Sequence, residues 1–241
     1  MTVALETVGL KKSFGGVKVI DDLSITLNEG EALGIVGPNG AGKTTLFNLV
    51  TGVYRPDAGR VVFKGTDITH KARQDRCRGG IGRTYQIPKP FADMNVFENV
   101  LVCAAHARGM SERASYRRCV EVLEIAGLTD MANMQAGALT LLNRKRLELA
   151  RALAGDPTVL LLDEIAGGLT EAEVDQLIAT IRELRSGGLS IVWIEHIVHA
   201  LVAVVDHICA INFGAKIAEG GPGDVIASAE VQACYMGGTP V

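Results

Sequence analysis

One glycine-rich stretch has the residue types and spacing needed to bind phosphate: Gly37-Pro38-Asn39-Gly40-Ala41-Gly42-Lys43-Thr44-Thr45. It fits the pattern G-x-x-x-x-G-K-[ST] without a gap. The glycines let successive backbone N–H groups turn toward phosphate oxygens, and Lys43 brings a mobile positive charge to the β- and γ-phosphates. The Thr44 hydroxyl is a hard oxygen ligand of the kind that Mg²⁺ prefers. The stretch therefore predicts a site for a nucleoside triphosphate with Mg²⁺.

Two carboxylates and a histidine stand where parallel strands would end. Asp163 and Glu164 follow the apolar run 158–162, and His196 follows the apolar run 189–194. Ligands of parallel sheets bind at the carboxyl ends of the strands, which is also where a phosphate loop lies. We expect Asp163 to hold Mg²⁺, Glu164 to act as general base on the attacking water, and His196 to reach the γ-phosphate.

The flanking segments have the patterns that such a site needs. The apolar run 33–36 before the phosphate loop is typical of a buried strand, and residues 45–50 after it have helical spacing. A helix beginning there places a partial positive charge under the phosphates.

The rest of the chain predicts an α/β fold in three parts. Residues 1–30 and 60–65 have the alternation and turn residues of antiparallel strands, whereas the block from about 95 to 153 is helical. Strands and helices alternate again after it, which favours a parallel sheet. We expect one domain over 1–241, with an α/β core plus antiparallel part at 1–86 and 156–241 and an inserted helical subdomain at 87–155. The basic stretch 71–83 is interpreted as a solvated helix face.

Composition narrows the class of protein. The chain has 241 residues, 48% of them hydrophobic, and a net charge of −3, so nothing in its charge demands a nucleic-acid partner. Its five cysteines form no C-x-x-C pair, which favours reduced thiols and no zinc site. The first residues lack the pattern of a secretory leader, and the apolar stretch 197–213 contains Asp206 and His207, so we expect a helix and a strand there and no membrane span.

The order of these motifs resembles that of the ATP-binding subunits of ABC transporters along essentially the whole chain. The segments 83–86 (RTYQ), 146–151 (RLELAR) and 194–196 (IEH) are most similar to the Liv-type subunits, which energise import of branched-chain amino acids and related solutes. The resemblance implies a P-loop NTPase core, ATP and Mg²⁺ as cofactors, and a peripheral place on the cytoplasmic face of the plasma membrane.

The resemblance also implies residue roles and partners. Phe14 matches the aromatic residue that stacks on adenine, and Gln86 matches the glutamine that contacts Mg²⁺ and the attacking water. The segment 86–91 would lie where membrane permease subunits dock, with a solute-binding protein as an indirect partner. Asp163, Glu164 and His196 match the metal-binding acid, the catalytic acid and the switch histidine. The family works as a head-to-tail pair of such subunits, identical or different, in which each phosphate loop faces the signature motif of the other subunit.

The signature motif departs from the family pattern Leu-Ser-x-Gly-Gln. Positions 139–143 read Leu-Thr-Leu-Leu-Asn, so Thr140 can still cap a helix and contact phosphate in trans, but Leu142 occupies the glycine position. Thr170 also stands where the family usually has Asp or Asn. We expect an attenuated trans half of the site. Two other classes stay open: a soluble ABC ATPase without a transporter, and a P-loop small-molecule kinase.

Overall fold

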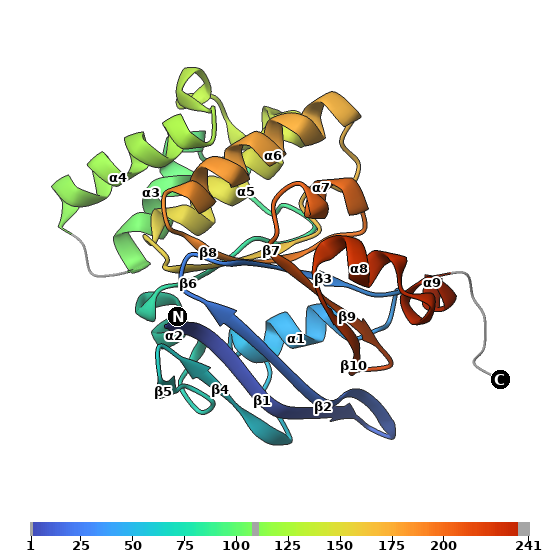
Figure 1. The fold of residues 1–241 in the computed structure, drawn as a ribbon. Helices are drawn as coiled ribbons and strands as arrows, with labels where there is room; N and C mark the ends of the chain where they lie inside the picture. The colour runs from blue at the N-terminus through green and yellow to red at the C-terminus, as the bar shows by residue number, and fades with distance from the viewer. Residues whose placement is uncertain (1, 108–110, 236–241) are drawn as a thin grey trace.

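The computed structural model describes residues 2–107 and 111–235, and their strands form two sheets (Figure 1). One is a four-stranded antiparallel sheet in the order β2-β1-β4-β5, and the other is a six-stranded sheet in the order β10-β9-β3-β8-β7-β6. The first contains β1 (Val3–Phe14), β2 (Val17–Asn28), β4 (Ala58–Phe63) and β5 (Thr66–Asp67). The second contains β3 (Ala32–Val36), β6 (Ile81–Arg83), β7 (Val159–Asp163), β8 (Ser190–Ile194), β9 (His207–Asn212) and β10 (Ala215–Gly220).

The six-stranded sheet is parallel except at β10, which pairs antiparallel with β9. Every residue of β3, β7 and β8 is buried, as expected for central strands covered on both faces. Strands β7 and β8 are neighbours in a register that pairs Asp163 with Ile194. The ends of these strands therefore bring residue 164 and residue 196 to the same edge of the sheet.

Helices cover both faces of this sheet (Figure 1). Helix α1 (Lys43–Val50) lies between the two sheets, and its Leu46, Phe47 and Leu49 are buried in the core that the sheets share. Helices α3 (Val96–Ala107), α4 (Glu112–Ile125), α5 (Leu141–Ala154) and α6 (Glu171–Ser186) lie on the opposite side. Shorter helices are α2 (Arg73–Gly79), α7 (Val198–Val202), α8 (Pro222–Ala227) and α9 (Ala229–Tyr235), with 3₁₀ turns at Thr129–Met131 and Ala136–Ala138. The expected α/β class with an antiparallel β part is confirmed.

The interpretation of residues 71–83 as a solvated helix face is wrong at two positions. Arg76 is only 2% exposed, and its guanidinium donates to the carbonyl oxygens of Leu49, Val50 and Thr69. The cation therefore satisfies carbonyls at the end of α1, where the helix dipole favours positive charge. Arg83 lies on β6 with its side chain 5% exposed. Strand β6, at the edge of the parallel sheet, was not expected from the sequence.

Candidate functional site

The phosphate loop joins β3 to α1 and depends on two glycines. Gly42 has a φ of 102° and directly precedes α1, a conformation that residues with a Cβ rarely adopt. A Cβ added at Gly37 would lie 2.2 Å from the Ile211 carbonyl oxygen, so the loop can pass β9 only with glycine there. These constraints hold the backbone of residues 37–45 at the N-terminus of a helix, which is the geometry that binds phosphate.

Lys43 lies inside this loop. Its ammonium donates hydrogen bonds to the carbonyl oxygens of Gly37, at 2.7 Å, and Pro38, at 3.0 Å. Burial lowers the pKa of Lys43, and the carboxylates of Glu164 and Asp163 oppose that shift. The cation is thus held by the carbonyl oxygens of the loop itself, within electrostatic range of the two carboxylates.

Glu164 connects three motifs at the sheet edge. One carboxylate oxygen accepts a hydrogen bond from the Gln86 amide, and the other lies 2.9 Å from Nε2 of His196. Glu164 has a φ of 48°, a conformation that costs free energy in a non-glycine residue and is often found at functional sites. Its backbone N–H donates to the Ile194 carbonyl oxygen at 2.9 Å, which fixes this turn against β8. The structure therefore brings Gln86, Glu164 and His196 together.

A cavity of about 280 Å³ lies between the phosphate loop and Glu164. Its lining consists of Val19, residues 39–45, Gln86 and Glu164. Phe14 is at the end of β1, 40% exposed, and packs edge-on against Tyr54 with ring centroids 5.1 Å apart. Thr140 and Leu142 are not among the described residues that line the cavity, so within one chain they do not complete it.

Asp163 is buried beside this cavity and paired with Arg83. The guanidinium lies 2.9 Å from Oδ2 of Asp163 and also donates to the Asn48 side chain at 2.7 Å. The other carboxylate oxygen, Oδ1, is buried without a hydrogen-bond partner. Such an orphaned oxygen is unusual unless an ion or a water completes it. The residues present thus fit Mg²⁺, which the Thr44 hydroxyl, an Asp163 oxygen and the Gln86 amide oxygen would hold.

Replacing Arg83 by methionine is expected to destabilise the fold by about 3 kcal/mol at neutral pH, because breaking a buried ion pair leaves an uncompensated charge. Burial already raises the pKa of Asp163 against the opposing effect of Arg83. Without the guanidinium the cost should grow as pH rises through that pKa and fade once Asp163 is protonated. Denaturant unfolding at neutral and acidic pH measures the difference, and Arg83→Lys is the charge-conserving control. An equal loss at both pH values would contradict the prediction.

The segment 139–143 begins α5. The Thr140 hydroxyl accepts from the Asn143 backbone N–H at 3.4 Å and so caps the helix, as expected. Leu142 is half-buried in the first turn. Its neighbour Leu141 is 46% exposed, and its Cδ2 lies 3.3 Å from where a Cβ on Gly168 would be. Leu141 therefore lies against Gly168, and Leu142 occupies the next position in the first turn of α5.

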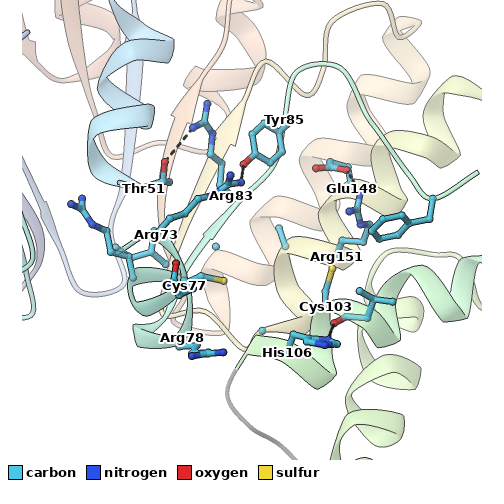
Figure 2. Close-up of a pocket in the computed structure, with 18 residues that line it drawn as sticks. Thr51, Arg73, Cys77, Arg78, Arg83, Tyr85, Cys103, His106, Glu148 and Arg151 are labelled. Carbon is cyan, nitrogen blue, oxygen red and sulfur yellow. Dashed lines mark hydrogen bonds and ion pairs between the residues drawn. The ribbon is translucent and has the colours of Figure 1, made fainter. Parts of the chain in front are cut away.

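A second and larger cavity, of about 430 Å³, has Arg83 among its lining residues (Figure 2). Figure 2 shows Arg73, Arg83 and Tyr85 on one side of it and Glu148, Arg151 and Cys103 on the other. The groove thus runs between the α2–β6 region and helices α3 and α5. Five arginines and one glutamate are among its lining residues: Arg73, Arg76, Arg78, Arg83, Arg151 and Glu148.

The loop 86–91 forms part of the groove wall and is held by two polar side chains. Arg151 donates to the Lys89 carbonyl oxygen at 3.1 Å and lies 5.3 Å from the centre of the Phe91 ring. The buried amide of Asn99 accepts from the Phe91 backbone N–H at 2.8 Å and donates to its carbonyl oxygen at 3.0 Å. One end of this loop therefore contacts Glu164 through Gln86, and the other end is fixed to the helical layer.

Sequence reasoning missed three charged residues near the site. Arg83 was grouped with a surface patch, and Lys145 and Glu195 were given no role, yet all three side chains are largely buried. The signal that could have found Glu195 is its place directly after an apolar strand and before His196, since a carboxylate there needs buried partners.

The remaining expectations concern metals, thiols and membrane spans. The five cysteines are free, and no group of three or more His, Cys, Asp and Glu residues in the described ranges could hold a metal ion. Within residues 2–107 and 111–235, no helix combines the length and the apolar character that crossing a bilayer requires.

The fold and the loop geometry define a P-loop nucleotide-binding cassette, and comparison with known proteins identifies its family. Residues 20–167 match the ABC transporter family model, so the chain belongs to that family. It is 36% identical to the high-affinity branched-chain amino acid transport ATP-binding protein BraF of Pseudomonas aeruginosa, over 97% of each chain. It is 35% identical to LivG of Salmonella typhimurium, a protein of the same description, over 95% of this chain and 96% of that one.

Solved structures agree with this assignment. The ADP conformation of MJ1267, an ATP-binding cassette of an ABC transporter, superposes with a TM-score of 0.90 and 31% identity, over 98% of this chain and 100% of that one. A nucleotide-free ATP-binding cassette from an ABC transporter gives a TM-score of 0.89 and 30% identity, over 97% and 98%. The resemblance inferred from the motifs is confirmed.

Proposed function

We propose that this protein is the ATP-hydrolysing subunit of an ABC importer for branched-chain amino acids or a related small solute. The observation that carries the proposal is the contact of Glu164 with both Gln86 and His196 at the mouth of the phosphate cavity. The Glu164 carboxylate can activate a water there, while Gln86 and His196, which contact it, can respond to the presence or loss of the γ-phosphate. The solute class rests on the printed descriptions of the BraF and LivG relatives.

The residues of the site have separate roles in ATP binding and hydrolysis. The loop 37–45 and Lys43 bind the β- and γ-phosphates, and Phe14 offers an exposed ring to the adenine. Thr44, Asp163 and Gln86 would hold Mg²⁺, which would neutralise part of the phosphate charge. Glu164 accepts the proton of the attacking water, and His196 holds Glu164 in orientation through its 2.9 Å contact.

A small-molecule kinase would use the same phosphate loop, but it would transfer phosphate to a substrate, and its base would accept the proton of the substrate hydroxyl rather than that of water. The product distinguishes these classes. Release of inorganic phosphate from ATP, in the absence of any acceptor, supports hydrolysis, whereas ADP formed only with an acceptor indicates a kinase.

Transport is tested by reconstitution. The chain, permeases encoded beside its gene and their solute-binding protein are placed in proteoliposomes, and ATP-dependent uptake of labelled leucine, isoleucine and valine is measured. Uptake that Glu164→Gln abolishes supports the proposal. Phosphate release without association with any such permease, and recovery only in the soluble fraction, would favour a soluble ABC ATPase.

We also propose that two such subunits pair head-to-tail, so that Thr140 and Leu142 of one subunit face the phosphate loop of the other. Support comes from the cavity itself, since its described lining includes no residue of α5. The segment 139–143 begins that helix, with Leu142 in its first turn. A leucine side chain at this point hinders the approach of a phosphate to the helix N-terminus.

Leu142→Gly is therefore expected to raise ATP turnover by about 10-fold, the size of one regained hydrogen bond to a charged group. Turnover is measured with and without a Liv-type partner subunit that has an intact signature motif. Leu141→Gly is the matched control, because it removes the adjacent leucine from the same turn. If the wild type alone hydrolyses ATP as fast as the glycine variant, the signature is not attenuated.

We further propose that the groove beside loop 86–91 receives a cytoplasmic segment of the permease, which places the chain at the cytoplasmic face of the membrane. The groove is bordered by the Phe91 ring, which is 47% exposed, and by the exposed Arg73 and Arg78. The proposed boundary between the core (1–86, 156–241) and the helical insertion (87–155) falls at this loop.

Phe91→Glu is expected to reduce co-purification with the permease at least about 10-fold, since it replaces an exposed aromatic contact by a charge that must be desolvated. ATP affinity of the isolated subunit should be retained, because Phe91 is outside the phosphate cavity. An unchanged permease yield would place docking elsewhere.

A further inference from the structure

Glu195 is a buried carboxylate for which the proposed chemistry has no use. It is 1% exposed and lies between the last residue of β8 and His196. Burial of an ionised carboxylate is costly unless hydrogen bonds or a cation compensate it. Its contacts therefore indicate what it stabilises.

Those contacts join two loops. One Glu195 oxygen accepts from the Ala166 backbone N–H at 2.7 Å, and the other accepts from the His196 backbone N–H at 3.0 Å. The Ile197 backbone N–H also donates to this carboxylate. Ala166 follows Glu164 by two residues, so one side chain holds the backbone on both sides of the Glu164–His196 contact.

Lys145 adds the third element. It lies on α5, is 4% exposed, and its ammonium donates to the Glu164 carbonyl oxygen at 3.3 Å. Lys145 also acts electrostatically on Glu195, since the charge of each group favours the ionised form of the other. The helix that begins at the signature segment is thus connected to the backbone of Glu164.

We propose that Glu195 is a positioning residue for hydrolysis, which together with Lys145 sets the relative position of Glu164 and His196. Glu164 and His196 touch each other through flexible side chains, and Glu164 is in a strained backbone conformation. Without the Glu195 bridge, the loop after Glu164 and the loop of His196 can separate. ATP binding does not depend on this bridge, because the phosphate loop makes no contact with it among the hydrogen bonds described above.

The experiment rests on the proposed ATPase function and uses Glu195→Gln in the full chain. Glutamine keeps one acceptor oxygen but replaces the other by an NH₂ group that cannot accept from a backbone N–H. We expect kcat to fall about 10-fold or more, as for other supporting residues around a site, with the Kd for ATP within about twofold of wild type. Asp206→Asn is the matched control. Asp206 also accepts from a backbone N–H, that of Ala32, and pairs with Arg185, but it lies at the opposite end of the sheet.

Two further measurements separate positioning from general stabilisation. In a double-mutant cycle with His196→Ala, Glu195→Gln should cost little beyond the single histidine variant, because both act on the same contact. Lys145→Met should also lower kcat, as Glu195→Gln does. The proposal is overturned if the double variant loses kcat by the product of the two single losses. It is also overturned if Glu195→Gln loses kcat and ATP affinity equally.

Hydrogen exchange tests the hydrogen bonds of Glu195 to the Ala166 and His196 amides independently of ATP hydrolysis. Peptides containing the Ala166 and His196 amides should lose more protection in Glu195→Gln than in wild type and Asp206→Asn, by more than any fall in melting temperature accounts for. Unchanged protection at both amides refutes the inference whatever the activity. If the wild type releases no phosphate from ATP, it is the proposed function that fails, and the exchange result still decides the bridge.

Discussion

Glutamine in place of Glu164 is expected to lower ATP hydrolysis by about 100-fold or more while ATP still binds. General-base catalysis by a positioned side chain contributes rate factors of this order. Glutamine has nearly the same shape but cannot take a proton from water. The phosphate loop and Lys43 make their hydrogen bonds independently of the Glu164 side chain, so the variant should keep the nucleotide.

The measurement pairs steady-state phosphate release with equilibrium binding of ATP. Glu171→Gln is a suitable control, because Glu171 is an exposed glutamate in the first turn of α6. The control should match wild type in both assays. Hydrolysis by the Glu164 variant at more than a tenth of the wild-type rate would assign the base to another group.

Alanine in place of Lys43 is expected to weaken ATP binding by about 10- to 100-fold, with a corresponding loss of hydrolysis. Hydrogen bonds to charged groups contribute about 1.5–3 kcal/mol, and the Lys43 ammonium is the cation placed within the loop. Its pKa is lowered by burial, and phosphate charge would favour the ammonium form again.

Lys216→Ala controls for the loss of one positive charge from the chain, since Lys216 is exposed on β10 and pairs with Glu219. Titration with ATP and with ADP at constant ionic strength gives the two affinities. If Lys43→Ala binds ATP as tightly as the control does, the phosphates are not in the loop 37–45.

The described contacts form a connected path from the groove to the site. Arg151 and Asn99 hold the loop 86–91, and Gln86 at its start contacts Glu164. A permease segment bound to this loop, as proposed, would therefore act through Gln86 on Glu164, the proposed general base. The Arg83–Asp163 pair, three residues before Gln86, connects the same strand to the proposed Mg²⁺ site.

The sequence by itself determined the phosphate loop, the central strands and the principal helices. These features are local: the loop is one contiguous run with glycines where the backbone requires them, and β7 and β8 are apolar runs with polar residues at their ends. Thr140 and Thr170 cap α5 and α6 at the positions where their residue types predict helix starts. The alternation of strands and helices then favours a parallel sheet, which brings Glu164 and His196 to one edge.

Only the tertiary structure decided which other charges serve the site. Arg83 and Asp163 are 80 positions apart, and Ala166 and Glu195 are 29 apart, so no local pattern specifies either contact. A basic run has the same appearance in sequence whether its side chains are solvated or buried, because burial depends on what packs against it. Arg76, Arg83, Lys145 and Glu195 acquire their partners only when the strand ends, α1 and α5 come together.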